Sequence, residues 1–130
     1  MMSRMSESRQ RVLVVEDSAT MRGFVTAALE SAGPYSVTQA ESGFQALKVL
    51  PRTHYDLIIT DINMPDINGL ELVRFIRESE AHRTTPLIII STDGRDVDRD
   101  RGLKLGANAY LVKPFAPEKL LETVRSVLSA

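Results

Sequence analysis

The feature that most constrains the fold is an alternation, repeated five times, between a short apolar run and a segment with helical periodicity. Apolar runs cover residues 12–15, 57–60, 87–90 and 109–112, and residues 35–39 are predicted to form the second strand in chain order. Several are rich in β-branched residues, which favour strands. Strict alternation of strand and helix is typical of parallel strands joined by right-handed crossovers, with helices on both faces of the sheet. The sequence therefore predicts an α/β fold with a five-stranded parallel sheet.

The segments between the runs carry helix signals. Ser18 or Thr20 can cap the first helix, and Gly33 with Pro34 ends it. Ser42 begins the second helix, the third follows a loop at 62–68, and the last covers about 117–128. The inward positions that we expect are Met21, Phe24, Val25, Ala28 and Leu29; Phe44, Leu47 and Leu50; Leu70, Leu72, Val73 and Ile76; and Leu120, Leu121, Val124, Val127 and Leu128.

The fourth helix, about 95–105, is different because nearly all of its residues are polar. We expect only Val97, Leu103 and Leu105 to anchor it. Its basic residues alternate with Asp96, Asp98 and Asp100, which indicates a solvated helix face rather than a nucleic-acid-binding stripe.

Composition narrows the possible functions. The 130 residues fit one domain. The chain has no cysteine, so thiolate metal sites are not expected. The net charge is −1, so the chain has no basic field that would attract nucleic acid or a membrane. Residues 1–9 lack the apolar run of a secretory signal, and no segment is apolar enough to span a membrane. We expect a flexible N-terminal tail over 1–9, one domain over 10–130, and a cytoplasmic location.

Polar residues follow the strands that should lie centrally. Open parallel sheets bind ligands beyond the carboxyl ends of their strands, where the strand order reverses. Three neighbouring carboxylates would repel each other, and a hard divalent cation such as Mg²⁺ relieves that repulsion. The residues at these strand ends are Glu16 and Asp17, Asp61 and Asn63, Ser91, and Lys113.

The same group of residues indicates phosphoryl chemistry. An aspartate can accept a phosphoryl group as an acyl phosphate, a labile bond suited to a reversible signal. Lys113 supplies a mobile positive charge, and Ser91 supplies a hydroxyl for a phosphate oxygen. We therefore predict that Asp61 is a phosphoacceptor beside bound Mg²⁺.

Four separated motifs resemble those of the receiver domain of two-component response regulators, of the stand-alone CheY-like type. They are VLVVEDS at 12–18, DINMPDINGL at 61–70, LIIIS at 87–91 and GANAYLVKPF at 106–115. Each lies at a strand end, they occur in the right order, and together they span almost the whole chain from residue 11. The resemblance implies a flavodoxin-like doubly wound (βα)5 fold with strand order 2-1-3-4-5.

The resemblance also implies a role for each matching position. Asp61 would be the phosphoacceptor, and Lys113 would contact the phosphoryl group after an expected cis bond to Pro114. Mg²⁺ would be bound by the carboxylates of Asp17 and Asp61 and the main-chain carbonyl of Asn63, with Glu16 contributing through water. Ser91 and Tyr110 would be the switch residues, and Asn63 and Asp93 would modulate the rate of dephosphorylation.

The function implied is a phosphorylation-activated signalling switch in a phosphorelay, which catalyses its own phosphorylation from a phosphohistidine and its own dephosphorylation. The donor would be a histidine kinase or phosphotransfer protein, and a phosphatase could assist removal. An output protein would dock on the surface formed by helix 95–105, strand 109–112 and the last helix. No nucleic-acid or membrane partner is expected, and a role in chemotaxis or in kinase regulation fits this type.

Three other functions deserve comparison. An aspartyl phosphatase of the haloacid dehalogenase type needs a second Asp two residues after the nucleophile, where this chain has Asn63. A flavodoxin-like mononucleotide binder needs a hydroxyl-rich loop after the first strand, where Glu16 and Asp17 would repel a phosphate. A receiver-like interaction module that works without phosphorylation has no need of the acidic pair or Lys113. His54 and His82 fall outside the site, and we expect both to be surface loop or helix-end residues.

Overall fold

The computed structural model describes residues 9–129, which form a five-stranded parallel sheet in the order β2-β1-β3-β4-β5. This confirms the predicted flavodoxin-like fold and strand order. Of the predicted tail over 1–9, only Arg9 lies within the described residues. The elements are β1 (Gln10–Val15), α2 (Ala19–Ala32), β2 (Tyr35–Ala40), α3 (Gly43–Val49), β3 (Leu57–Asp61), α4 (Gly69–Glu78), the 3₁₀ helix η1 (Glu80–His82), β4 (Leu87–Ser91), α5 (Asp96–Leu105), β5 (Ala109–Val112) and α6 (Pro117–Ser129).

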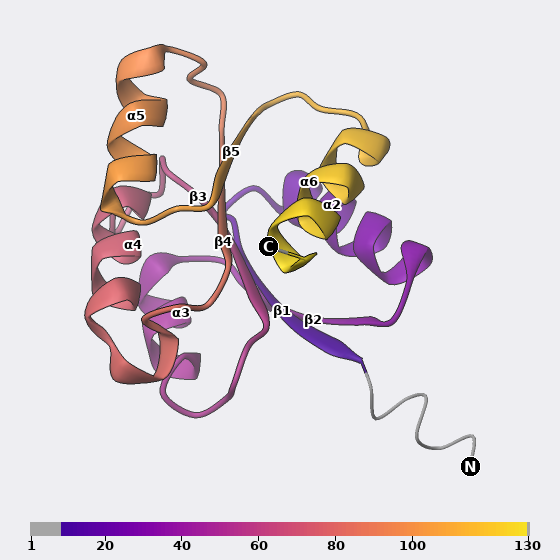
Figure 1. Ribbon diagram of the computed structural model, residues 1–130, viewed down its shortest axis with the longest axis horizontal. Coiled ribbons are helices and arrows are strands. Elements are labelled where there is room, and N and C mark those ends of the chain that lie inside the picture. Colours follow the sequence, from indigo (N-terminus) through magenta and orange to yellow (C-terminus); the bar gives the residue numbers. More distant parts are fainter. Residues whose placement is uncertain (1–8, 130) are drawn as a thin grey trace.

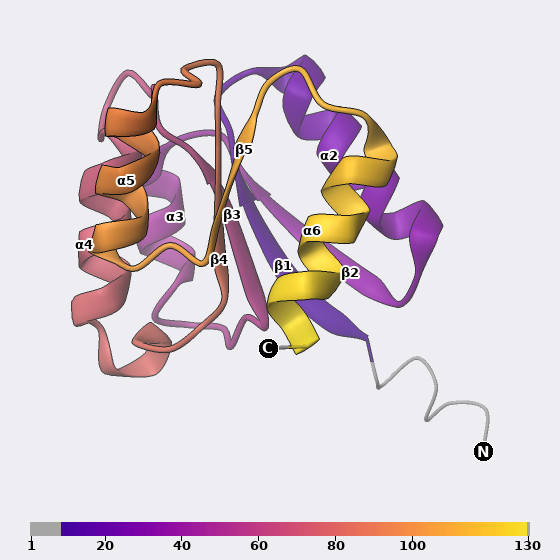
Figure 2. The ribbon, with the colours of Figure 1, turned by 45° about the horizontal axis from the view of Figure 1, so that its top comes forward.

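The sheet lies between two helical layers. Helices α2 and α6 cover one face, and α3, α4 and α5 cover the other (Figures 1 and 2). Successive side chains of a strand point to opposite faces, so that each strand supplies both layers. In β1, Val12 and Val14 pack toward α2 and α6, whereas Leu13 and Val15 pack toward α3 and α4. The side chains of β3 and β4 are buried throughout, which identifies these as central strands.

The helix starts follow the capping residues in the sequence. Ser18 Oγ accepts a hydrogen bond from the main-chain N–H of Met21 (3.2 Å), and Ser42 Oγ accepts one from Gln45 (3.1 Å). Helix α4 begins after Asn68, whose Oδ1 accepts from the N–H of Leu70 (2.8 Å). These bonds satisfy main-chain donors that the first turn of a helix leaves free. No helix within residues 9–129 has the length and apolar character needed to cross a membrane.

Three of the side chains that were expected to face inward are exposed instead. Phe44 is 56% exposed, because α3 turns Ala46 and Leu50 toward the sheet and packs Gly43 against Ile67. Helix α5 was expected to be anchored by Val97 and Leu103, yet these side chains are 67% and 41% exposed.

Helix α5 instead approaches the sheet through a residue without a side chain. Gly102 is buried, and a Cβ atom there would lie 2.6 Å from Cδ1 of Ile89 on β4. Leu105 is the one expected anchor that packs against the core. Because few apolar side chains hold α5, it is a helix that can shift at low cost in free energy.

His54 is exposed as expected, and His82 ends the 3₁₀ helix η1, but His82 is buried rather than on the surface. His82 is 1% exposed, and its Nε2–H donates to the carbonyl of Leu50 (2.8 Å). Since Nε2 carries the proton, Nδ1 accepts from the hydroxyl of Thr85 (3.2 Å). The imidazole therefore joins η1 to the end of α3, a long-range contact that local sequence does not reveal.

We predict that His82→Ala lowers the free energy of unfolding by about 2–4 kcal/mol, because it leaves a cavity and an unpaired buried carbonyl. His82→Gln should recover part of the loss, since its amide can donate to Leu50. His54→Ala is the matched control, and its effect should fall within about 0.5 kcal/mol because His54 is exposed. Urea unfolding measures all three. Equal losses for the two alanine variants would contradict the buried role of His82.

Candidate functional site

The strand order brings the two acidic segments together. Strands β1 and β3 are neighbours, with Val15 opposite Thr60, so that Glu16 and Asp61 follow side by side at the carboxyl ends. The chain leaves β1 toward β2 on one side and returns to β3 on the other, so this is where the strand order reverses. Asp61 is 4% exposed at the end of β3. The structure thus brings Glu16 and Asp61 together at the edge of the sheet where the sequence predicts them.

Main-chain groups of the following loop hold the Asp61 carboxylate. Its Oδ1 accepts hydrogen bonds from the N–H groups of Ile62 (2.7 Å) and Asn63 (3.4 Å). The loop closes where the N–H of Gly69 donates to the carbonyl of Ile62 (2.7 Å). A Cβ atom at position 69 would lie only 2.0 Å from the main-chain oxygen of Asp61. The close approach of α4 to Asp61 therefore requires glycine at this position.

The same loop is also fastened to α3 through Asp66. Its two carboxylate oxygens accept from the N–H groups of Gly43 (3.2 Å) and Phe44 (2.9 Å) at the start of that helix. These main-chain bonds, that from Phe44 first, hold the pKa of the Asp66 carboxyl below its usual value. The loop that carries Asp61 and Asn63 is thus bonded both to itself and to a neighbouring helix.

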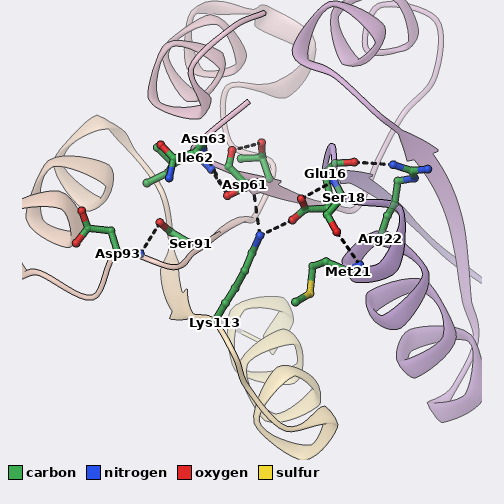
Figure 3. A network of polar contacts seen from close by, with 11 residues as sticks. Glu16, Ser18, Met21, Arg22, Asp61, Ile62, Asn63, Ser91, Asp93 and Lys113 are labelled. Atoms are coloured by element: carbon green, nitrogen blue, oxygen red, sulfur yellow. Dashed lines mark hydrogen bonds and ion pairs between the residues drawn. The ribbon is translucent and has the colours of Figure 1, made fainter. Parts of the chain in front are cut away.

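Lys113 reaches the acidic residues from the far side of β4. Its main-chain N–H donates to the carbonyl of Ser91 (2.7 Å), which fixes the end of β5 beside that of β4. Its Nζ donates to Glu16 Oε1 (2.7 Å) and lies 3.4 Å from Asp61 Oδ2 (Figure 3). The bond between Lys113 and Pro114 is cis, as expected from the sequence.

Glu16 is fully buried and already has partners for both carboxylate oxygens. Besides Lys113 on Oε1, the N–H of Ser18 donates to Oε2 (2.9 Å). Burial raises the pKa of Glu16 most, and the charge of Asp61 raises it further, although the bonds from Lys113 and Ser18 act in the opposite direction. Because its two oxygens are engaged, Glu16 fits a metal site best through an intervening water.

The acidic group has the donors that Mg²⁺ prefers. Glu16, Asp17 and Asp61 each place a carboxylate oxygen within 4.8 Å of the others, and Asp17 is exposed to solvent. Lys113 supplies a single positive charge against these three carboxylates, so a divalent cation would complete the neutralisation. Mg²⁺ typically binds proteins through one or two carboxylates and keeps several waters. The residues present therefore fit this ion.

The predicted switch residues lie on the adjoining strands and meet at Asp93. Ser91, fully buried at the end of β4, accepts a hydrogen bond on Oγ from the N–H of Asp93 (3.0 Å). Tyr110 on β5 is half-buried, and its hydroxyl donates to the carbonyl of Asp93 (2.7 Å). The side chain of Asp93 pairs with Arg95, which holds the pKa of the Asp93 carboxyl far below its usual value. In Figure 3 this carboxylate points away from Asp61.

Three residues of the site were missed in the sequence. Arg22 donates from Nη1 to the carbonyl of Glu16 (2.8 Å) and from Nε to Gln39 (3.0 Å), which holds the loop after β1. Gly69 permits the close approach of α4, and Arg95 binds Asp93. The proximity of Arg95 to Asp93 in the chain was a usable signal, whereas the contacts of Arg22 and Gly69 depend on how the strands and helices pack.

Comparison with known proteins gives a consistent result. The family described as response regulator receiver domain matches residues 12–125. A chemotaxis protein CheY homolog of Campylobacter jejuni is 40% identical over 119 residues, covering 91% of this chain and 92% of that protein. The chemotaxis response regulator CheY4 of Vibrio cholerae has a similar structure, with a TM-score of 0.87, 37% identity, and coverage of 92% of this chain and 99% of that one.

A further solved structure is that of the receiver domain of the sensor histidine kinase PA1611 of Pseudomonas aeruginosa, which has a magnesium ion coordinated in its active-site cleft. The TM-score is 0.86 with 32% identity, and the match covers 95% of this chain and 100% of that domain.

Proposed function

The chain belongs to the response regulator receiver domains of two-component systems, and from this premise we propose that Asp61 accepts a phosphoryl group from a phosphohistidine. The donor would be a histidine kinase or a phosphotransfer protein. The observation that supports this most is the position of the Asp61 carboxylate, which is 4% exposed and lies 3.4 Å from the ammonium of Lys113. A buried carboxylate beside a mobile cation and two further carboxylates is suited to phosphoryl transfer.

The proposed step is a displacement at phosphorus. A carboxylate oxygen of Asp61 forms a bond to phosphorus while the P–N bond of the donor breaks, and the bonding electron pair leaves on the imidazole nitrogen. Lys113 lies within reach of both Glu16 and Asp61, so its ammonium can turn from one carboxylate to the incoming phosphoryl oxygens. The N–H groups of Ile62 and Asn63 keep the Asp61 side chain oriented during the step.

Mg²⁺ would be held by Asp17, Asp61 and the main-chain carbonyl of Asn63, with Glu16 acting through water. When bound, it neutralises charge on the phosphoryl oxygens. The close grouping of the three carboxylates supports this proposal, as does the magnesium ion in the similar receiver domain from Pseudomonas aeruginosa.

The output is proposed to be a change of surface rather than a released product, as expected of a signalling switch. Ser91 would turn toward the phosphoryl group and Tyr110 would move with it, because both are bonded to Asp93. Helix α5 lies next to them and has few apolar anchors. An output protein would then dock on α5, β5 and α6, where Val97, Leu103 and Val112 are exposed apolar side chains.

Dephosphorylation would return the switch to its resting state. Asn63 is exposed beside Asp61, and Asp93 lies on the loop after β4, so both are placed to modulate the approach of water. A partner phosphatase would add to this intrinsic rate. We further propose that residues 10–130 form one receiver domain that works in the cytoplasm through protein partners, without a nucleic-acid or membrane ligand.

Formation of a labile phosphoprotein that depends on Mg²⁺ tests the function. We predict that acetyl phosphate with Mg²⁺ labels the protein, that EDTA suppresses the labelling, and that the label decays once the donor is removed. Magnesium dependence is expected because the acidic cluster otherwise repels a phosphate. Mass spectrometry of the intact protein measures the added phosphoryl group.

Two results would count against the proposal. Equal labelling with and without EDTA would exclude a role for the metal, and no labelling under any condition would favour a receiver-like module that works without phosphorylation. A label that persists for many hours would contradict only the proposed self-dephosphorylation, and not the acceptor role of Asp61.

A further inference from the structure

The loop between β4 and α5 contains an ion pair that the proposed chemistry does not use. Arg95 Nε lies 3.1 Å from Asp93 Oδ1, and its Nη2 lies 2.8 Å from Oδ2. The main-chain N–H of Arg95 also donates to Asp93 Oδ1 (3.0 Å). Nη2 makes a further contact with Asp98 on the first turn of α5 (3.2 Å). The guanidinium thus joins the loop to the start of α5, and we call these three residues the Arg95 cluster.

The guanidinium binds Asp93 in a two-pronged geometry. Such contacts between arginine and a carboxylate fix direction as well as distance, whereas a lysine acts as a point charge. The Arg95 side chain is 77% exposed, so that this cluster contributes little to global folding. Its effect is instead expected on the position of Asp93.

Asp93 is the residue through which the two switch side chains meet. Its N–H donates to Ser91 Oγ, and its carbonyl accepts from the hydroxyl of Tyr110. When Arg95 holds the side chain of Asp93, it therefore also restricts the main chain to which Ser91 and Tyr110 are bonded. Ser91 and Asp93 line a cavity of about 190 Å³ together with Ile62 and Asn63, the two residues that follow Asp61 in the chain.

In the arrangement held by this cluster, the Ser91 hydroxyl is bonded to Asp93 rather than to the acceptor. Ser91 Oγ is bonded to the N–H of Asp93, and no hydrogen bond joins it to Asp61 among the described residues. To bond a phosphoryl oxygen on Asp61, Ser91 must turn toward the acceptor, and because its Oγ accepts from the N–H of Asp93, the main chain at Asp93 must follow. A restraint on Asp93 opposes that movement and favours the unphosphorylated arrangement.

We propose that Arg95 is a positioning residue that sets how readily the switch responds: through Asp93 and Asp98 it restrains the loop to which Ser91 and Tyr110 are bonded. This inference rests on the proposed phosphorylation of Asp61. Its effect is modest by nature, because an exposed ion pair changes an equilibrium by about two- to fivefold. A change of that size is enough to alter the fraction of a signalling protein in its active form.

Binding of beryllofluoride with Mg²⁺, a phosphoryl mimic, provides the test. The full chain with Arg95→Gln should bind it about two- to fivefold more tightly than the wild type at low salt. The difference should vanish at 1 M salt, where exposed charges are screened. Arg95→Lys keeps the charge but loses the two-pronged contact, so that its affinity should be intermediate.

Arg99→Gln is the matched control. Arg99 lies one turn further along α5, and its side chain pairs with Asp96 (2.7 Å) and makes no bond to Asp93 among the described residues. Its removal should leave the affinity for the mimic unchanged. Isothermal titration calorimetry measures the affinities, and amide hydrogen exchange at Asp93 should be faster in Arg95→Gln than in Arg99→Gln.

The outcomes separate the two proposals. If Arg95→Gln binds the mimic as the wild type does, or more weakly, the restraining role of Arg95 is overturned while the acceptor role of Asp61 stands. If the wild type does not bind the mimic in a magnesium-dependent way, the proposed function itself fails. If Arg99→Gln gains the same affinity, the gain results from the changed net charge of α5. That result would also overturn the role of Arg95.

Discussion

Replacing Asp61 with asparagine is expected to abolish labelling by acetyl phosphate. The amide cannot serve as the phosphoryl acceptor, and it also removes one carboxylate from the metal-binding group. Asparagine has nearly the same shape, so the bonds from the N–H groups of Ile62 and Asn63 can be kept. Mass spectrometry with acetyl phosphate and Mg²⁺ should detect no phosphorylated species above the background of untreated protein.

The loss should not result from unfolding. Asp61 raises the pKa of buried Glu16 through charge repulsion, so that removing its charge relieves an unfavourable interaction. We therefore expect the Tm of Asp61→Asn without Mg²⁺ to be equal to or higher than that of the wild type. Asp66→Asn is a suitable control for the loss of a carboxylate from this loop. Asp66 lies in the same loop, but it binds the start of α3. Labelling of Asp61→Asn at the wild-type level would move the acceptor to another residue.

Replacing Gly69 with alanine is expected to cause a large loss of stability. The added Cβ would lie 2.0 Å from the main-chain oxygen of Asp61 and 2.6 Å from Cα of Ile62. Both are main-chain atoms, which cannot rotate aside, so that α4 or the end of β3 must shift. Overpacking of this kind lowers the free energy of unfolding by about 3 kcal/mol.

The same substitution should also weaken phosphorylation in the protein that remains folded. The displaced oxygen belongs to Asp61, so its carboxylate moves relative to Lys113 and the acidic pair. Misplacement of a reacting group by about 1 Å can reduce a rate by about 100-fold. Urea unfolding gives the stability, and labelling rates measured without urea give the functional effect.

Gly23→Ala provides a control of opposite sign. Gly23 lies within α2, and a Cβ atom there would meet no heavy atom within 4 Å. Alanine is favoured over glycine in a helix interior by about 1 kcal/mol, so that this variant should be stabilised. If Gly69→Ala were also stabilised, the close approach of α4 to Asp61 would be wrong.

Much of the site could be predicted because strands and their ends are encoded locally. The apolar runs before Glu16, Asp61, Ser91 and Lys113 identify the strand ends, and parallel strands have their carboxyl ends at one edge. The residue types then indicate the chemistry. Contacts between residues that are far apart in the chain could not be predicted, and the bond from His82 to Leu50 is an example.

The three wrong predictions of inward-facing helix side chains have one physical origin. The helical period shows that Phe44, Val97 and Leu103 lie on helices, but not how each helix is rotated or how closely it approaches the sheet. That depends on the small residues at the contacts, Gly43 against Ile67 and Gly102 against Ile89. Such contacts form between elements, and their effect on exposure follows only when the layers are assembled.

The sequence by itself thus determined the alternating elements, the strand ends and the chemical character of the residues placed there. These follow from backbone preferences and from the two periods of strand and helix, which act over short stretches of chain. Only the tertiary structure decided that Lys113 reaches Glu16 and Asp61 across β4, that Gly69 permits the approach of α4, and that the main chain of Asp93 joins Ser91 to Tyr110. Those contacts depend on distances between strands and helices, which are set by the packing of the whole core.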